Sequence, residues 1–251
     1  MLPPFPFRTL LDLVFPPVCV SCNRVRLLPA PAPQALPGLC PNCRRTVFLN
    51  EEPCCARCGE AFAAPGSHPY TCSTCRGRSF AFDFALARCR SAAAARDSVH
   101  RLKYGHDLPL ARILAAWMAP LLDHPRLATR QDWLLVPVPL HPRKQRERGF
   151  NQAAELTRWL SKLRGLPQAP VLQRIRYTAS QTGFHRTQRA LNLEGAFAIR
   201  PRPALQAGLS GRGVLLVDDV FTTGSTAHEC ARVLRETGGA EKVVVLTVAR
   251  G

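Results

Sequence analysis

The stretch VLLVDDVFTTGST, residues 214–226, places two adjacent carboxylates directly before a run of small hydroxyl-bearing residues. Carboxylates repel phosphate, whereas the backbone N–H groups and the dipole at the start of a helix attract it. We therefore expect Asp218 and Asp219 to accept hydrogen bonds from hydroxyl groups, while the loop after them cradles a phosphate. Gly224 lets the backbone approach that phosphate closely. A sugar phosphate is a ligand that satisfies both halves of the stretch.

The elements that must position this stretch alternate along the chain between apolar strands and periodic helices. Strands or extended segments are predicted at residues 80–89, 133–138, 214–217 and 243–248, and helices at 92–104, 108–122, 151–163 and 225–237. Such alternation predicts an α/β fold with a parallel sheet flanked by helices. In these sheets ligands bind at the carboxyl ends of the strands, and residues 218–226 follow a strand at such an end.

Other phosphate-binding motifs are excluded by the order of the residues. The chain has no GxxxxGK[ST] sequence, and Gly211 and Gly213 precede the strand at 214–217 instead of following it as a dinucleotide-binding fingerprint requires. An aspartate pair of the receiver-domain kind needs most of its domain downstream, but only 32 of the 251 residues follow Asp219.

Eight of the eleven cysteines form four Cys-x-x-Cys pairs in the first 75 residues, namely Cys19 and Cys22, Cys40 and Cys43, Cys55 and Cys58, and Cys72 and Cys75. Two residues between thiolates let one tight turn present both sulfurs to a tetrahedral zinc ion. The gaps favour joining the first pair with the second and the third with the fourth, which predicts two structural zinc ions. An interleaved pairing, or replacement of one ligand by Cys54 or His68, stays open. Cys89 and Cys230 are expected to be small core residues.

The chain carries a formal charge of +17, and much of the excess is local. Residues 143–189 hold eleven basic side chains against Glu147 and Glu155, which favours a strip that faces a nucleic acid or a phosphorylated metabolite. No secretory signal is evident, and no apolar run approaches the ~18 residues of a membrane span. We therefore expect a soluble cytoplasmic protein without a transmembrane segment, whose reduced thiols can bind metal.

The stretch at 214–226 resembles the phosphoribosyl-diphosphate signature of type I phosphoribosyltransferases. That signature consists of a strand, paired acids and the loop for the 5-phosphate of the donor. By this resemblance Asp218 and Asp219 would meet the ribose 2- and 3-hydroxyls. The 5-phosphate would be bound by Thr222, Thr223, Gly224, Ser225 and Thr226.

Three further segments extend the resemblance, namely VPVPLHPRKQRERGFNQA at 136–153, HRLKYG at 100–105 and RIRYTASQTGFHRTQRALNLEGAF at 174–197. With the cysteine-rich ribbons before them, they resemble the ComF family of competence-associated proteins over essentially the whole chain. The resemblance implies a double zinc ribbon at 1–78 and a type I phosphoribosyltransferase-like domain at 79–251. It also implies a link to competence and to the DNA-uptake machinery.

The same resemblance implies roles for residues in the segment after the strand at 133–138. The loop with Leu140, His141 and Arg143 would receive the diphosphate of the donor, while magnesium would bridge the diphosphate and ribose oxygens. Arg148 and Lys103 would add positive charge, with a solvated surface position as an equal alternative for each.

A polar, aperiodic and basic segment at 177–189 has the character of a mobile lid. Within it, Arg186 and Arg189 are candidates for contacts with an anion, with packing or contact with RNA or DNA as the alternatives. The local charge excess would also suit single-stranded DNA.

Two functional hypotheses from different classes remain. In the first, the chain is a magnesium-dependent phosphoribosyltransferase with an unknown acceptor, and its catalytic residues are Asp218, Asp219, Arg143 and Arg148. In the second, it is a non-catalytic protein that binds phosphoribosyl diphosphate as a signal and holds single-stranded DNA. The two intact aspartates favour donor binding, whereas the absence of a recognisable nucleobase pocket favours the second hypothesis.

Overall fold

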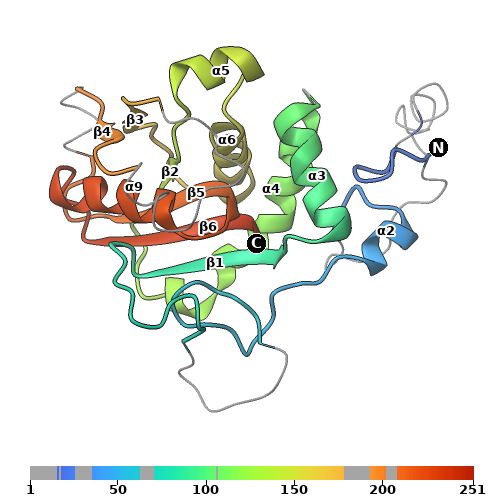
Figure 1. The fold of residues 1–251 in the computed structure, drawn as a ribbon, viewed down its shortest axis with the longest axis horizontal. Coiled ribbons are helices and arrows are strands. Elements are labelled where there is room, and N and C mark those ends of the chain that lie inside the picture. Colours follow the sequence, from blue (N-terminus) through green and yellow to red (C-terminus); the bar gives the residue numbers. More distant parts are fainter. Residues whose placement is uncertain are drawn as a thin grey trace, which may run out of the picture.

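The computed structural model describes residues 16, 18–25, 36–62, 71–105, 107–177, 193–201 and 208–251. At its centre is a four-stranded sheet in the order β1, β6, β5, β2, in which every neighbouring pair runs parallel (Figure 1). The strands are β1 (Phe84–Arg90), β2 (Leu134–Pro137), β5 (Gly213–Phe221) and β6 (Lys242–Arg250). The parallel sheet predicted from the sequence is therefore confirmed.

Helices accompany the sheet in the described parts of the chain. They are α2 (Pro41–Arg45), α3 (Ala93–Tyr104), α4 (Pro109–Met118), α5 (Pro142–Arg148), α6 (Gln152–Arg164) and α9 (Ser225–Glu236). The single helix predicted at 108–122 is split, because α4 gives way to a 3-10 helix at Ala119–Asp123. Pro120 lacks the N–H that a continuing α-helix would use, and its ring crowds the preceding turn.

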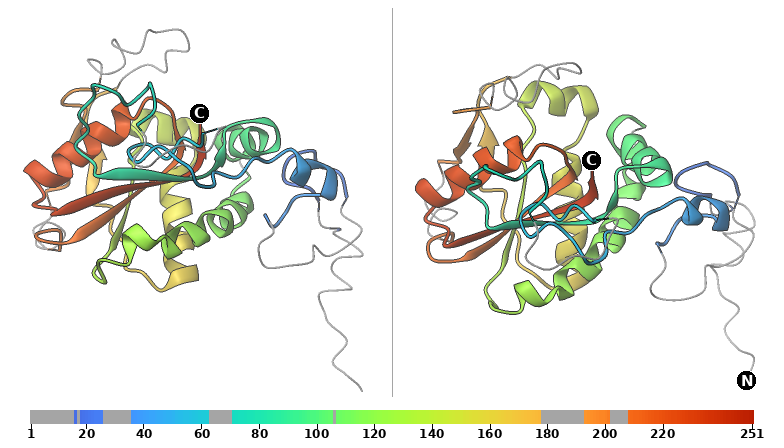
Figure 2. Two further views of the ribbon diagram at one scale, coloured as in Figure 1. Left: turned by 90° about the horizontal axis from the view of Figure 1, so that it is seen from below. Right: turned by 60° about the horizontal axis from the view of Figure 1, so that its bottom comes forward.

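The two faces of the sheet belong to two different hydrophobic cores, because successive side chains of a strand point to opposite faces. In β5, Leu215 and Val217 pack in one core with α4 and α6. Val214 and Leu216 pack in the other core with α9. Figure 2 shows α9 on one face of the sheet and α4 and α6 on the other. Helices thus cover both faces, as the buried apolar strands require.

Three elements beside the sheet, one helix and a pair of short strands, were not predicted from the sequence. The helix α5 has no buried residue and hence no apolar periodicity to reveal it. The strands β3 (Leu172–Arg174) and β4 (Phe197–Ile199) pair antiparallel over only three residues each, which is too short to show alternation. Both α5 and β3 contribute side chains to a cavity at the carboxyl ends of β2 and β5.

The cysteine-rich N-terminal region covers the edge strand β1. Leu49 forms an antiparallel bridge with Cys89, and the N–H of Ala85 donates to the carbonyl of Arg57 at 2.8 Å. A covered edge cannot pair with the edge strand of another molecule. Within the described ranges, no helix combines the length and the apolar character needed to span a membrane.

Candidate functional site

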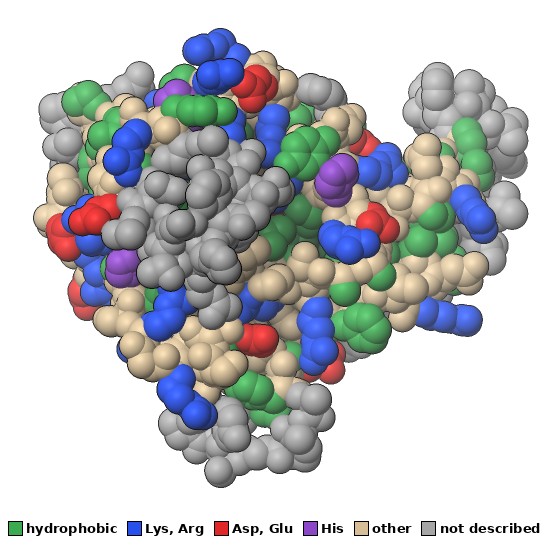
Figure 3. Space-filling model, in the orientation of Figure 1, with side chains coloured by type: hydrophobic (Ala, Val, Ile, Leu, Met, Phe, Trp, Pro, Cys, Tyr) green, Lys and Arg blue, Asp and Glu red, His purple; other side chains and the backbone are tan. Residues whose placement is uncertain are grey.

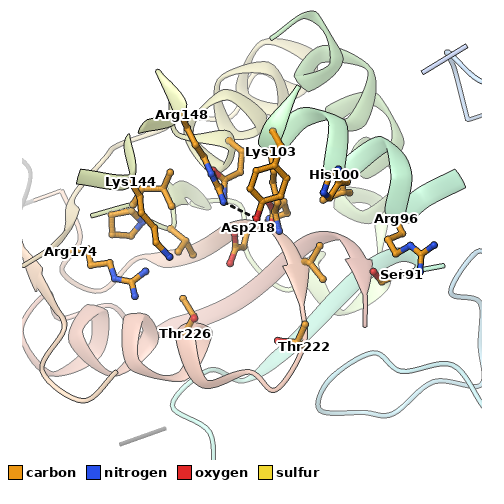
Figure 4. Close-up of a pocket in the computed structure, with 18 residues that line it drawn as sticks. Ser91, Arg96, His100, Lys103, Lys144, Arg148, Arg174, Asp218, Thr222 and Thr226 are labelled. Atoms are coloured by element: carbon orange, nitrogen blue, oxygen red, sulfur yellow. Dashed lines mark hydrogen bonds and ion pairs between the residues drawn. The ribbon is translucent and has the colours of Figure 1, made fainter. Parts of the chain in front are cut away.

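A cavity of about 450 Å³ opens where β2 and β5 end. Its basic lining residues outnumber its acidic ones, since Asp218 and Asp219 are surrounded by Arg96, Lys103, Lys144, Arg148 and Arg174. Figure 4 places Asp218 near the centre of the cavity, between α3 on one side and the basic residues of α5 and β3 on the other. Figure 3 shows Lys and Arg side chains spread over the face of the molecule that it draws. A cavity of this charge suits an anionic ligand.

Asp219 is the most buried acid of the cavity, and only one of its two side-chain oxygens is paired. Its Oδ1 lies 3.0 Å from Nζ of Lys103, and its backbone N–H donates to Oδ1 of Asp218 at 2.9 Å. Its Oδ2 is buried and has no hydrogen-bond partner among the described residues. Leaving a buried acceptor unsatisfied costs about 1–3 kcal/mol, and more for a charged group. A donor brought by a ligand would satisfy this oxygen.

The two carboxylates and Lys103 influence one another's charge. Burial, and then the negative charge of Asp219, raise the pKa of Asp218 to about 7. Burial alone would lower the pKa of Lys103, but the carboxylates of Asp219 and Asp218 outweigh it and raise that pKa. The cavity thus holds a buried ion pair, with a second carboxyl group that titrates near neutral pH.

The loop Thr222–Thr226, which we call the phosphate loop, joins β5 to α9 and surrounds a hollow of about 40 Å³. Gly224 has a φ of +78°, and a Cβ there would lie 2.7 Å from the ring of Phe221, so a glycine is required. Oγ1 of Thr223 and Oγ of Ser225 lie 3.0 Å apart. The first N–H groups of the 12-residue α9 have no partner within that helix, and its dipole is positive at this end. The geometry suits a phosphate.

Four cysteines come together at each of two places in the N-terminal region. The first cluster is Cys19, Cys22, Cys40 and Cys43, and the second cluster is Cys55, Cys58, Cys72 and Cys75. Within each cluster all sulfurs lie within 4.8 Å of one another, and single pairs lie 3.8 Å and 3.5 Å apart. A tetrahedral zinc ion with Zn–S bonds of about 2.3 Å needs sulfurs about 3.8 Å apart, so both clusters fit structural zinc. The predicted pairing is confirmed.

The remaining cysteines take no part in these clusters. Sγ of Cys54 lies 3.0 Å from the carbonyl oxygen of Glu51, to which it donates. Cys89 and Cys230 are fully buried, as expected for core residues, and burial raises the pKa of Cys89 to about 12. His68, the other alternative ligand, lies outside the described residues.

Comparisons with known proteins agree with this arrangement. A family model described as a double zinc ribbon domain matches residues 10–76. Competence protein F of Haemophilus influenzae is 30% identical over 217 residues, which cover 85% of this chain and 90% of that protein. This chain belongs to the ComF family.

Further relatives support the assignment to the ComF family. DNA utilization protein YhgH of Escherichia coli K12 is 29% identical over 219 residues, covering 82% of this chain and 94% of that protein. Competence protein ComFC of Bacillus subtilis is 31% identical over 156 residues, covering 62% and 59% of the two chains. A solved structure of the allosteric regulatory enzyme of purine biosynthesis matches 57% of this chain and 25% of that chain, with 17% identity and a TM-score of 0.34. A TM-score of this size does not by itself show a common fold.

Only some of the predicted site residues line the cavity. Arg148 and Leu140 line it. His141 instead caps α5, where its Nδ1 accepts the N–H of Arg143 at 3.2 Å. The Arg143 side chain is 63% exposed and pairs with Glu147 at 3.2 Å. His141 and Arg143 thus flank the cavity from outside its lining.

Several residues that line the cavity were not predicted as site residues. Lys144 and Arg174 lie on α5 and at the end of β3, so they could not be placed while those elements were unknown. His100 and Tyr104 were within reach of sequence reasoning, because they are one helical turn apart in HRLKYG. Their rings lie 4.6 Å apart, and the guanidinium of Arg148 lies 5.0 Å from the Tyr104 ring. Three planar groups therefore gather at the cavity, with the His100 and Tyr104 rings tilted by 45° and Nη2 of Arg148 donating to the Tyr104 hydroxyl at 3.4 Å.

The basic wall of the cavity is electrostatically crowded. Burial, and then the charges of Arg174 and Arg148, lower the pKa of Lys144. Burial also lowers the pKa of Arg174. A bound anion would favour the charged form of each of these groups. The predicted lid residues Arg186 and Arg189 lie outside the described residues, so their roles stay predictions.

Proposed function

We propose that the cavity binds phosphoribosyl diphosphate together with magnesium, and that the chain transfers phosphoribose to an acceptor. The observation that carries this proposal is the buried Oδ2 of Asp219, which has no donor among the described residues. It lies in a cavity that adjoins the phosphate loop. A sugar phosphate offers hydroxyl donors for the carboxylate and a phosphate for the loop.

The proposed arrangement assigns each part of the donor to named residues. Asp218 and Asp219 accept hydrogen bonds from the ribose hydroxyls, and the phosphate loop holds the 5-phosphate. Lys103 and Arg148 face the diphosphate, with the backbone at Leu140 beside it. Carboxylate oxygens are ligands that magnesium accepts, and the bound ion would offset the charge of the diphosphate.

The proposed transfer is a displacement at C1 of the ribose. The bond between C1 and the diphosphate oxygen breaks, and its electron pair leaves with the diphosphate. A nucleophilic atom of the acceptor forms the new bond to C1 and loses its proton to water. The residues of the cavity contribute by holding the donor in one orientation, which removes much of the entropic cost of the reaction.

A second candidate function is a non-catalytic protein that responds to phosphoribosyl diphosphate and binds single-stranded DNA. The observation that favours it is the group of planar side chains His100, Tyr104 and Arg148, with Tyr104 59% exposed, because nucleobases stack on such planar groups. Relatives named Competence protein F and DNA utilization protein YhgH support a role in DNA uptake or use. We place this role in the cytoplasm, where thiols stay reduced for zinc.

Calorimetric titration with phosphoribosyl diphosphate and magnesium tests donor binding. The double variant Asp218→Asn/Asp219→Asn is expected to bind at least about 100-fold more weakly, because two charged acceptors are lost. Asp132→Asn serves as the matched control, since Asp132 pairs with Arg130 before β2, away from the cavity. Equal affinity of the folded double variant and the wild type would refute the proposal.

A product assay separates the two candidate functions. The protein is incubated with labelled donor, magnesium and a cell extract, and diphosphate and ribosylated products are followed. A new ribosylated product establishes transfer. Donor binding without any product, together with salt-dependent binding of single-stranded DNA, establishes the second function.

A further inference from the structure

We propose that the second cluster positions the phosphate loop, so that zinc in this cluster and phosphate affinity in the cavity are thermodynamically linked. The connection runs through Arg250 at the end of β6 and Arg78 just after the cluster. This inference rests on the proposed function in one respect, namely that the loop binds the phosphate of the ligand.

Arg250 joins the second cluster directly to the phosphate loop. It is buried, with 7% of its surface exposed. One end of its guanidinium lies against the cluster, where Nη2 is 3.7 Å from Sγ of Cys58 and 3.2 Å from Oε2 of Glu60. The other end reaches the loop, where Nη1 donates to the carbonyl of Thr222 at 2.9 Å. The guanidinium also lies 5.2 Å from the ring of Phe221.

Arg78 forms a second connection, three residues beyond Cys75. Its Nη1 donates to the carbonyl of Thr223 at 3.1 Å. The guanidinium lies 4.6 Å from the ring of Phe80, and that ring would lie 3.1 Å from a Cβ placed on Gly224. The segment that leaves the second cluster therefore packs against the backbone of the loop.

The arginines orient the loop because a trans peptide points its C=O and its N–H in opposite directions. The carbonyls of Thr222 and Thr223 are both held by guanidinium groups. The N–H groups of Thr223 and Gly224 are therefore kept on the opposite side of their peptide planes. These donors are then available to a phosphate instead of turning with a loose loop.

Zinc enters this network through the charge of the second cluster. Four thiolates and one zinc ion leave a net charge of −2, which a buried guanidinium can offset. Groups that hydrogen-bond to metal ligands are oriented by the filled site. Loss of zinc would release the four sulfurs from one another, so Cys58 would no longer be fixed against the guanidinium that also donates to the carbonyl of Thr222.

Hydrogen exchange measured by mass spectrometry tests the connection without any ligand. The full-length zinc-loaded protein is compared with Arg250→Gln and with Arg78→Gln, which disturbs the core less. Each variant is expected to exchange the amides of residues 222–226 about tenfold faster, the change expected for loss of one charge-assisted hydrogen bond. Arg235→Gln is the matched control, because Arg235 pairs with Asp83 at the opposite end of α9. Exchange at 222–226 that is the same in all four proteins would overturn the proposal.

A cysteine pair tests the part played by zinc. Cys72→Ser and Cys22→Ser are each expected to lose one zinc ion, but only Cys72→Ser is expected to speed exchange at residues 222–226. Equal protection of these residues in the two variants, at one zinc ion each, would show that the second cluster does not position the loop.

Ribose 5-phosphate is the probe for the effect on binding. Arg250→Gln is expected to weaken its binding about tenfold relative to wild type, with two zinc ions retained. Wild-type protein that binds no ribose 5-phosphate would refute the proposed function, while the exchange experiments still decide whether the cluster positions the loop. Wild-type binding that Arg250→Gln and Arg78→Gln leave unchanged would refute the linkage alone.

Discussion

The two four-cysteine clusters share the same Cys-x-x-Cys pattern but lie in different surroundings. In the first cluster Cys19 is buried, Cys22 is exposed and the other two ligands are half-buried. In the second cluster all four ligands are buried and belong to the core that also contains α9. Identical local spacing therefore produces one cluster at the surface and one inside the body of the protein.

The two ribbons therefore have different structural tasks. The first cluster is attached to the helices α3 and α4, where Arg101 donates to the carbonyl of Cys19 at 3.2 Å and Trp117 donates to the carbonyl of Pro37 at 2.8 Å. The second cluster contacts Arg250 and is followed by the segment that packs on the phosphate loop. Damage to the second cluster should thus spread into the sheet, whereas damage to the first should stay local.

Replacing one ligand in each cluster is expected to give the largest difference between them. Cys58→Ser should lower the melting temperature by at least about 10 °C, because a buried zinc site contributes several kcal/mol of folding free energy. Cys22→Ser should lower it by about 2–4 °C, the shift for about 1 kcal/mol in a chain of this size. Thermal melting with parallel zinc analysis measures both. Equal shifts, with one zinc ion lost in each variant, would contradict the comparison.

A second comparison concerns the two faces of the sheet, because the neighbouring residues Asp219 and Asp218 of β5 point to opposite faces. Lys103→Met tests the face covered by α3, the helix that contacts the first cluster. Lys103 belongs to α3 and pairs with the buried Asp219, so the variant leaves a buried carboxylate without its cation. We expect a loss of about 2 kcal/mol in the free energy of unfolding. The double variant Lys103→Met/Asp219→Asn should recover part of this loss. Denaturant unfolding measures all three proteins, and strictly additive effects would show that the pair is not coupled.

Asp218→Asn should have the smallest effect and tests the opposite face. In the folded protein the pKa of Asp218 is raised from about 3.8 to about 7. A raised pKa means that the contribution of this group to stability is complete below pH 3.8 and is lost as the pH rises through 7. The variant should therefore melt about 2–4 °C above wild type at pH 8, with the difference disappearing near pH 4. A difference that does not change with pH would rule out this titration.

Much of the architecture could be predicted from local patterns. Apolar runs predicted strands at residues 133–138, 214–217 and 243–248, which the structure has at 134–137, 213–221 and 242–250, because a sheet buried on both faces needs continuous hydrophobic segments. Strand β5 thus continues through Asp218 and Asp219, which were expected to follow it. The spacing of the cysteines predicted both clusters, because two residues between thiolates suffice for one tight turn. The helix α5 and the pair β3 and β4 could not be predicted, since a short exposed helix and three-residue strands carry no periodic signal.

The strand, the acid pair and the loop that follows them could be inferred from local patterns, because all three lie within 13 consecutive residues. The cysteine spacing favoured one pairing of the four Cys-x-x-Cys turns, and the structure confirmed it by bringing the sulfurs of each cluster together. The pairing of Lys103 with Asp219 and the contact of Arg250 with Cys58, 192 positions away, became visible only in the folded chain. Contacts of this kind depend on how the helices and ribbons pack on the sheet. No local spacing records that packing, because it arises from the burial of apolar surface that is shared by distant segments.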